Sequence, residues 1–262
     1  MSWISETDDL ENRDRLNKDL LPLTNKLMFQ VLGNPRGNYS QDCQAVTNLA
    51  IRKLIVTEDV GPFRVTGLAP AVDGLRRVFG DIQNELPDIY KALGNAGMLC
   101  CRFVRGSNSA ISNHSWGCAI DLTLEGKLDF RGDRKAQAGL KAIHPIFNRH
   151  EFYWGAAFGT EDAMHFEVSR QLLTKWHDDG VLGGSGLIKD VVDTIDFGDR
   201  GPEVGWLQER LNIVMGADLT QDGVFGAGTR AAVIAFQNKH QLKPDGIVGA
   251  TTREAIKTAQ VV

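Results

Sequence analysis

The chain has 262 residues, of which 42% are hydrophobic and 24% are charged, with a formal net charge of −4 and an isoelectric point near 5.9. This balance excludes a general electrostatic attraction to nucleic acid or to anionic membranes. No apolar run approaches the roughly 18–20 residues that a membrane-spanning helix needs. Residues 1–21 are acidic and polar, without the features of a signal peptide, so we expect synthesis in the cytoplasm without a secretory signal.

The pattern of apolar residues predicts an α+β domain in the first two thirds of the chain. Residues 1–45 show no pattern that indicates a chemical role, whereas residues 71–93 have the periodicity of a helix. The apolar side of this helix carries Leu75, Val78, Phe79 and Ile82. Three short runs predict strands, over residues 98–104, 118–124 and 163–169. A helix first and strands clustered later favour a central antiparallel sheet.

The four cysteines are predicted to be unpaired. Cys43, Cys100, Cys101 and Cys118 lack the CxxC spacing of metal sites. The adjacent pair at 100 and 101 would point to opposite faces of a strand, so they are poor partners for each other. We expect small buried thiols in a reducing compartment.

One stretch, SNHSWGCAID at residues 112–121, holds two good metal ligands, His114 and Asp121. Two ligands of one zinc ion lie at most about 4.4 Å apart, whereas seven residues of straight strand span about 23 Å. The two side chains can therefore share a metal only if the chain doubles back between them. Gly117 is suited to such a bend because glycine adopts unusual backbone angles at little cost.

A wider pattern surrounds this pair. It is S-x-H-x-x-G-x-A-x-D over residues 112–121, followed by D-x-x-H over residues 162–165. This pattern resembles the zinc peptidase family of D-alanyl-D-alanine carboxypeptidases, vancomycin-resistance dipeptidases and L-alanoyl-D-glutamate endopeptidases. The resemblance covers roughly residues 50–178 and includes CRFVRGS at 101–107 and FYWGAAF at 152–158.

The resemblance implies a role for each matching residue. A catalytic zinc would be held by His114, Asp121 and His165, with water in the fourth tetrahedral position. Asp162 takes the position of the general base, which accepts a proton from water and passes it to the leaving amine. Arg102 matches the family's arginine and is expected to stabilise the developing oxyanion.

Other residues in and near the two motifs have less definite roles. Arg105 is the reserve candidate for stabilising the oxyanion, and Ser112 and Asn113 are expected to orient the ligands. Trp116 is either a substrate wall or a packing residue. Glu161, next to the expected base, would point to the opposite face if both lay on a strand. The RGD sequence at 131–133 reads as an ordinary turn.

The C-terminal third contains an internal repeat. DGVFGAGTRAAV at 222–233 reappears 23 residues later as DGIVGATTREAI at 245–256. Each unit reads as an Asp-Gly turn that leads into a helix, with Thr229 and Thr252 as the expected N-caps. A third helix is expected in GPEVGWLQERLNIV at 201–214.

These segments, with their LQ and FQ pairs, resemble the peptidoglycan-binding-like domain, a compact three-helix module of cell-wall hydrolases, over about residues 197–260. The glycine-rich DGVLGGSGLIKD at 179–190 reads as a linker. We therefore expect a zinc peptidase domain at 1–178, a linker at 179–196 and a small three-helix peptidoglycan-binding domain at 197–262.

Together the resemblances imply a monomeric zinc-dependent hydrolase of bacterial peptidoglycan, with no nucleic-acid partner and no membrane insertion. The aspartate of the second motif is more similar to the L-alanoyl-D-glutamate endopeptidases of phages, so cleavage of the L-Ala–D-Glu bond is expected. The alternatives are a D,D-carboxypeptidase or D,D-endopeptidase of the same family, and a non-catalytic wall-binding protein. A phage endolysin released by holin-type lysis and a toxin exported by a specialised secretion system both fit the start of the chain.

Overall fold

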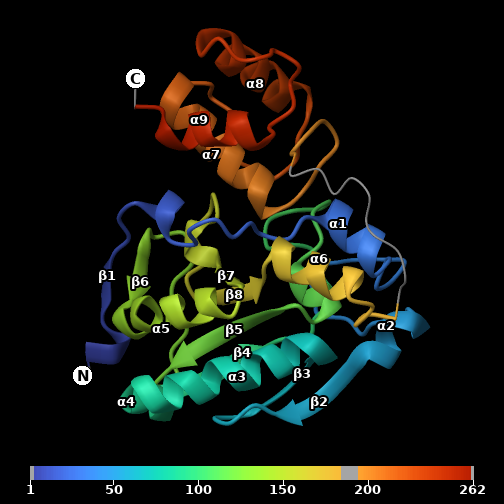
Figure 1. Ribbon diagram of the computed structural model, residues 1–262, viewed down its shortest axis with the longest axis vertical. Helices are drawn as coiled ribbons and strands as arrows, with labels where there is room; N and C mark the ends of the chain where they lie inside the picture. The colour runs from blue at the N-terminus through green and yellow to red at the C-terminus, as the bar shows by residue number, and fades with distance from the viewer. Residues whose placement is uncertain (1–2, 184–193, 261–262) are drawn as a thin grey trace.

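The computed structural model describes residues 3–183 and 194–260 (Figure 1). The expected α+β class is confirmed. One hydrophobic core extends from Ile4 to Leu182 and a second from Ile195 to Ile256. We call the regions around them the N-terminal domain (described residues 3–183) and the C-terminal domain (described residues 194–260). Most of the expected linker, at 184–193, lies outside the described residues.

The N-terminal domain is built on a four-stranded antiparallel sheet in the order β4-β5-β8-β7. Its strands are β4 (Leu93–Gly97), β5 (Ala119–Leu124), β7 (Phe152–Trp154) and β8 (His165–Val168). Strand β5 packs one face into the core, because Ile120, Leu122 and Leu124 are fully buried while the side chains between them are partly exposed.

Helices cover this sheet. Helices α3 (Ala69–Glu85) and α5 (Ala138–Arg149) contact each other, and Phe147 of α5 stacks on Phe166 of β8 with ring centroids 4.0 Å apart. The other helices and turns of the domain are η1 (Trp3–Ser5), η2 (Arg13–Arg15), α1 (Asn25–Val31), α2 (Leu49–Leu54), α4 (Pro87–Ala92), η3 (Asn113–Trp116), η4 (Gly155–Ala157) and α6 (Arg170–Asp178). Two further strand pairs are β1 (Thr7–Asp9) with β6 (Lys135–Gln137), and β2 (Ile55–Asp59) with β3 (Arg64–Leu68). Among the described residues, no helix is long and apolar enough to span a membrane.

Two predicted elements of the N-terminal domain differ from the structure. The helix expected over 71–93 ends at Glu85 and a short helix restarts at Pro87, because a proline disfavours helical angles in the residue before it. The strand expected over 98–104 is instead β4, which lies earlier, at Leu93–Gly97. Gly97 has φ +122° at an irregularity in the pairing with β5, so the chain leaves the sheet there.

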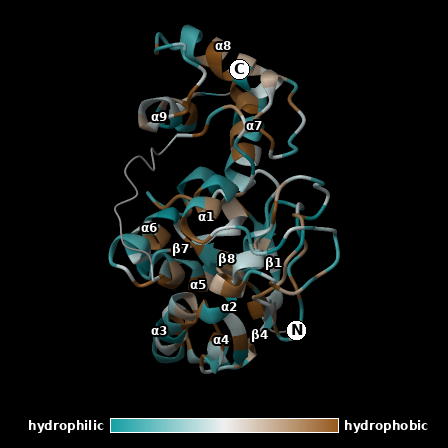
Figure 2. Ribbon diagram, turned by 90° about the vertical axis from the view of Figure 1, so that its right-hand side faces the viewer, coloured by the Kyte–Doolittle hydropathy of each residue, from teal (hydrophilic) through white to brown (hydrophobic). Residues whose placement is uncertain are grey.

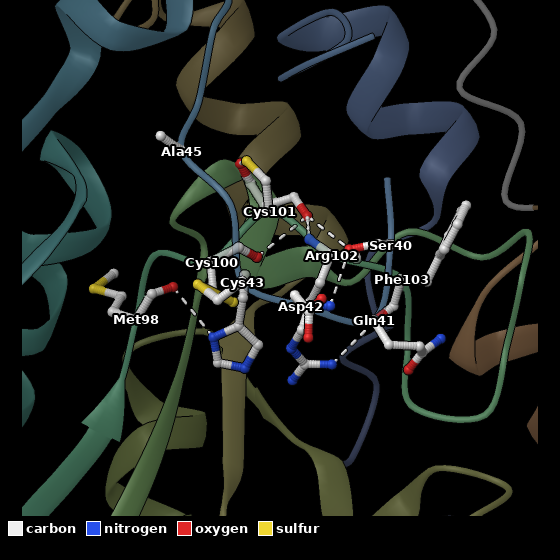
Figure 3. Close-up of a disulfide and its surroundings, with 12 residues drawn as sticks. Ser40, Gln41, Asp42, Cys43, Ala45, Met98, Cys100, Cys101, Arg102 and Phe103 are labelled. Atoms are coloured by element: carbon white, nitrogen blue, oxygen red, sulfur yellow. Dashed lines mark hydrogen bonds between the residues drawn. A yellow bond between two sulfur atoms is a disulfide. The ribbon is translucent and has the colours of Figure 1, made fainter. Parts of the chain in front are cut away.

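The prediction of four unpaired thiols is wrong for two of them. Cys43 and Cys100 form a disulfide with a Cα–Cα distance of 5.1 Å (Figure 3). Cys101 and Cys118 are buried free thiols. An antiparallel bridge between Gln44 and Cys101 places the two segments side by side. The partners are 57 residues apart in sequence, so local spacing carries no signal of this pair.

The C-terminal domain consists of α7 (Pro202–Met215), α8 (Ala227–Lys239) and α9 (Ala250–Thr258). It stacks above the N-terminal domain, and α7 reaches down to it in two perpendicular views (Figures 1 and 2). The expected N-caps are displaced. Helices α8 and α9 are capped by Gly226 and Gly249, and the threonines lie three residues further on.

One glutamine organises each turn of the repeat. Gln208 donates through Nε2 to Asp222 Oδ1 (2.8 Å), the Val224 carbonyl and Thr229 Oγ1, while its Oε1 accepts from Gly223 N. In the second turn, Gln237 makes the same four bonds to the equivalent positions 245, 247, 252 and 246. The repeat thus encodes a buried amide that satisfies the polar groups of an Asp-Gly turn.

We expect Gln237→Leu to destabilise the C-terminal domain by about 2–4 kcal/mol, because the backbone and side-chain partners of the amide would be left unsatisfied. Urea denaturation of the full chain measures the loss. Asn238→Leu, at an exposed neighbouring position of α8, is the matched control and should change stability by less than about 0.5 kcal/mol. An equal effect of the two substitutions would contradict the role given to the amide.

Candidate metal centre

Strand pairing brings the candidate ligands together. Asp121 of β5 lies directly opposite His165 of β8 in the antiparallel register. His114 arrives from η3, which is closed by Gly117 in the left-handed conformation (φ +68°). A Cβ at Gly117 would lie 2.7 Å from the backbone nitrogen of Leu68, so glycine also permits this close approach. The chain doubles back at the glycine where the sequence predicted a bend.

The three side chains converge on one point. His114 Nε2 lies 3.1 Å from Asp121 Oδ1 and 3.2 Å from His165 Nδ1, and the last two atoms are 3.2 Å apart. Metal–ligand bonds of about 2.0–2.1 Å in a tetrahedron place ligand atoms about 3.3 Å apart. The triangle therefore has the size that a tetrahedral divalent cation requires, and its N/O/N donors suit such an ion.

The ring nitrogens of the two histidines that point away from the triangle also have hydrogen-bond partners. His114 Nδ1 lies 3.1 Å from the carbonyl oxygen of Met98, which is drawn with the disulfide residues in Figure 3. His165 Nε2 lies 2.9 Å from Oε2 of the fully buried Glu167. Partners of this kind fix ring orientation and tautomer, so that the inner nitrogens are available as ligands.

Sequence reasoning missed Glu167. Its carboxylate also accepts from Asn113 Nδ2 (2.8 Å) and from the backbone N–H of Leu23 (2.9 Å). One signal could have found it. Residue i+2 on a strand points to the same face as residue i, so an acid two positions after a ligand histidine on β8 faces the same side.

The site is strongly polarised before any cation binds. Burial opposes a charge on Asp121, but the adjacent imidazoles of His114 and His165 hold the pKa of its carboxyl far below the ordinary range. Burial likewise lowers the pKa of His165, but Asp121 and Glu167 outweigh it and raise the pKa to about 10. Protons therefore compete with a cation for these side chains as pH falls.

Asp162 lies in the turn that precedes β8. Its N–H donates to the Gly155 carbonyl (3.1 Å), and its own carbonyl accepts from the N–H of His165 (3.1 Å). Its Oδ2 lies 3.2 Å from Nε of Arg131, while Oδ1 is buried with no hydrogen-bond partner among the described residues. Burial raises the pKa of Asp162 above 3.8, an effect that the charges of His165 and Arg131 oppose. Asp162 thus lines the same pocket as the triad with one carboxylate oxygen paired and the other buried.

Two expectations near this aspartate change. Glu161 and Asp162 are not on a strand, so alternation across a sheet does not separate them. Instead, Glu161 Oε2 accepts from the backbone N–H groups of Gly132 and Arg134, and its Oε1 accepts from that of Ala163. The RGD segment is a turn, as predicted, but its arginine, Arg131, also contacts Asp162 and lines the pocket.

The remaining candidates separate into pocket and packing residues. Arg102, Arg105 and Ser112 line the pocket that contains the triad. Ser112 N donates to the Arg102 carbonyl (3.0 Å), which ties the arginine segment to the metal loop. Burial and the nearby charge of Arg105 lower the pKa of Arg102. Trp116 is fully buried, donates to the Gly33 carbonyl (2.8 Å) and packs edge-on against an aromatic ring of α1, so it is a packing residue.

We expect Glu167→Gln to weaken metal binding by about 10–100-fold, because the carboxylate that orients His165 and increases its basicity is removed. His114→Ala, Asp121→Ala and His165→Ala should each abolish binding at the same metal concentration. Equilibrium dialysis with elemental analysis measures the bound cation. Lys91→Gln, an exposed substitution on α4, is the control and should bind like the parent chain. Unchanged affinity of Glu167→Gln would contradict the orienting role.

Comparison with known families agrees with this geometry. Residues 105–168 match the model of the D-alanyl-D-alanine carboxypeptidase family, and this segment contains the three candidate ligands and Asp162. Residues 200–256 match the model of the peptidoglycan binding domain family and cover α7, α8 and most of α9. No curated protein and no solved structure matches the chain. The two family matches, on separate segments of one chain, support a peptidase that acts on peptidoglycan.

Proposed function

We propose that the chain is a zinc-dependent peptidoglycan hydrolase that cleaves the stem peptide between L-Ala and D-Glu. The observation that carries the proposal is the triangle of His114, Asp121 and His165 with Asp162 beside it, in a pocket next to the peptidoglycan-binding domain. The donor set of two histidines and one carboxylate, which leaves an open position, is that of catalytic zinc sites.

Bound zinc would supply Lewis acidity, which lowers the pKa of water to about 7 and polarises a carbonyl group. Asp162 supplies the proton transfers. Its carboxylate, which lines the pocket, accepts the proton of the attacking water, and the carboxyl then donates it to the amine that leaves. A pKa raised by burial suits this role, because a group that acts first as a base and then as an acid is most effective when its pKa lies near the operating pH.

Two arginines supply positive charge to the pocket. Arg131 holds Asp162 at 3.2 Å, which orients the carboxylate and favours its charged form before reaction. Arg102 is our choice for stabilising the oxyanion that develops on the scissile carbonyl. Arg105 is more exposed and binds the Gln41 carbonyl at 2.9 Å, so it is placed at the rim.

The choice of the L-Ala–D-Glu bond as the cleaved bond depends on the aspartate of the second motif. A shorter acid holds its carboxylate nearer the backbone than glutamate does, so water and substrate must lie differently around the metal. Cleavage of D-Ala–D-Ala is the second candidate, because the matched family is described as a D-alanyl-D-alanine carboxypeptidase. We place the action at the bacterial wall after release from the cytoplasm, as in a phage endolysin or an exported toxin.

Digestion of purified sacculi should release stem peptides with new D-Glu amino termini. Amine labelling before acid hydrolysis, followed by mass spectrometry of the muropeptides, identifies the new termini. New D-Ala or diaminopimelate amines, or loss of free D-Ala, would replace the proposed bond by the D,D-specific alternatives. Labelled termini should disappear when the metal is removed by chelation and return when zinc is restored.

Asp162→Asn should retain zinc and lose most of its activity, by roughly 100-fold or more in kcat, because the proton acceptor is removed while the ligands remain. Elemental analysis and turnover of a soluble muropeptide are measured on the same sample. Asp133→Asn, in the nearby exposed turn, is the matched control and should retain activity. Near-normal turnover of Asp162→Asn would show that another group acts as the base. A parent chain that binds zinc but turns over no peptidoglycan would favour a non-catalytic wall-binding protein.

A further inference from the structure

The pocket at the metal centre has walls from both domains. It encloses a volume of about 290 Å³. One wall holds the triad, Asp162 and the three arginines of the N-terminal domain. The other wall comes from the C-terminal domain and consists of the start of α7 (Gly201, Pro202 and Gly205) and the first turn of the repeat (Gln221, Asp222 and Gly223).

This second wall is fixed by buried ion pairs. Glu203 of α7 is 1% exposed and binds Arg170 of the N-terminal domain on one side and Arg253 of α9 on the other. One turn and a half later, Glu209 accepts from Arg13 (3.1 Å) and Arg134 (2.8 Å). Arg134 is largely exposed, whereas Glu203 and its two arginines are buried, and such charges remain in place only while their partners are present, because unpairing one of them is costly. The two domains are therefore docked, and α7 is the docking helix.

The backbones also touch. A Cβ at Gly159 would lie 2.5 Å from the carbonyl carbon and oxygen of Gly205, and 2.8 Å from the N–H of Trp206. Trp206 in turn donates to Asp14 Oδ1 (3.1 Å), and the same carboxylate pairs with Arg210 (3.3 Å). Residues 1–45, which carried no readable role in the sequence, thus contribute to the docking surface.

The two walls differ in chemistry. The N-terminal wall carries Arg102, Arg105 and Arg131, which suit the carboxylates of a stem peptide. The C-terminal wall is rich in glycine and carries the exposed amide of Gln221 and the carboxylate of Asp222, whose Oδ1 accepts from Gln208 and from the backbone N–H of Val224. A neutral amide with backbone groups around it suits the hydroxyl and acetamido groups of a sugar, which carry no charge to pair with arginine.

We infer that the C-terminal domain completes the substrate site, and that the turn at Gln221–Gly223 contacts the sugar to which the stem peptide is joined. This inference rests on the proposed function, because L-Ala is the residue attached to the sugar and cleavage after it places the sugar next to the metal centre. The ligand class is a sugar-linked acidic peptide. The domain that binds the wall then also selects which peptides reach the metal.

The test compares two soluble substrates on the full-length zinc-loaded chain, a disaccharide-linked stem peptide and the same peptide without sugar. The parent chain should have the higher kcat/KM for the sugar-linked form. Gln221→Ala should lower that value about fivefold, as expected for one lost hydrogen bond, through KM, and leave the free peptide unchanged. Pro244→Ala, at the equivalent position of the second repeat, is the matched control and should change neither substrate.

A second variant acts on the docking itself. Gly159→Ala should push α7 away, because the three atoms nearest to the added methyl are backbone atoms of the other domain. The radius of gyration from small-angle X-ray scattering should rise, bound zinc should stay constant, and the preference for the sugar-linked peptide should fall at least about fivefold. Gly80→Ala, where a Cβ meets open space on α3, is the control.

Several outcomes would overturn the inference. The proposed sugar contact would be contradicted if the parent chain had equal kcat/KM for the two substrates. It would also be contradicted if Gln221→Ala kept the preference of the parent chain. A higher kcat/KM in Gly159→Ala would show that the C-terminal domain obstructs the pocket. If the parent chain cleaves neither substrate, the proposed function fails instead. Kd values of both ligands for the Asp162→Asn chain, measured by calorimetry, then decide the sugar contact without turnover.

Discussion

The antiparallel pairing of β5 with β8 is the constraint on which the site depends. It places Asp121 opposite His165, so two candidate ligands from distant parts of the sequence are held by backbone hydrogen bonds. Only the third, His114, needs a special turn, and Gly117 provides it. Because the strands belong to the core of the domain, the site needs no ordering on binding and its donor atoms are already preorganised.

Hydrogen bonds of buried polar groups link this strand pair to other segments of the domain. Glu167 links His165 to Asn113 and to the N-terminal segment at Leu23, so one carboxylate joins β8, η3 and the chain start. The disulfide of Cys43 with Cys100 lies one residue before Cys101, and the N–H of Cys100 donates to the carbonyl of His114 (Figure 3). The interactions that stabilise this part of the domain are therefore also those that orient the candidate ligands.

Docking of the two domains gives the chain a property that a flexible tether would not have. A tether raises the local concentration of an enzyme on an insoluble polymer, whatever the relative orientation of its parts. Here Glu203 and Glu209 of one helix are paired with arginines of the other domain, so the orientation is set as well. The pocket consequently presents two chemically different walls to one ligand.

The sequence by itself determined the class of the fold, which depends on periodicity. It also predicted a two-part organisation, the candidate ligands and a candidate base, through resemblances carried by short motifs such as His114 to Asp121. It did not determine the end of α3, the position of β4, the partner of Cys43 or the role of Glu167. Those were decided by the tertiary structure. A local sequence pattern does not show which distant segments meet in space. Strand register, a disulfide between cysteines 57 residues apart and ion pairs between domains all depend on such meetings.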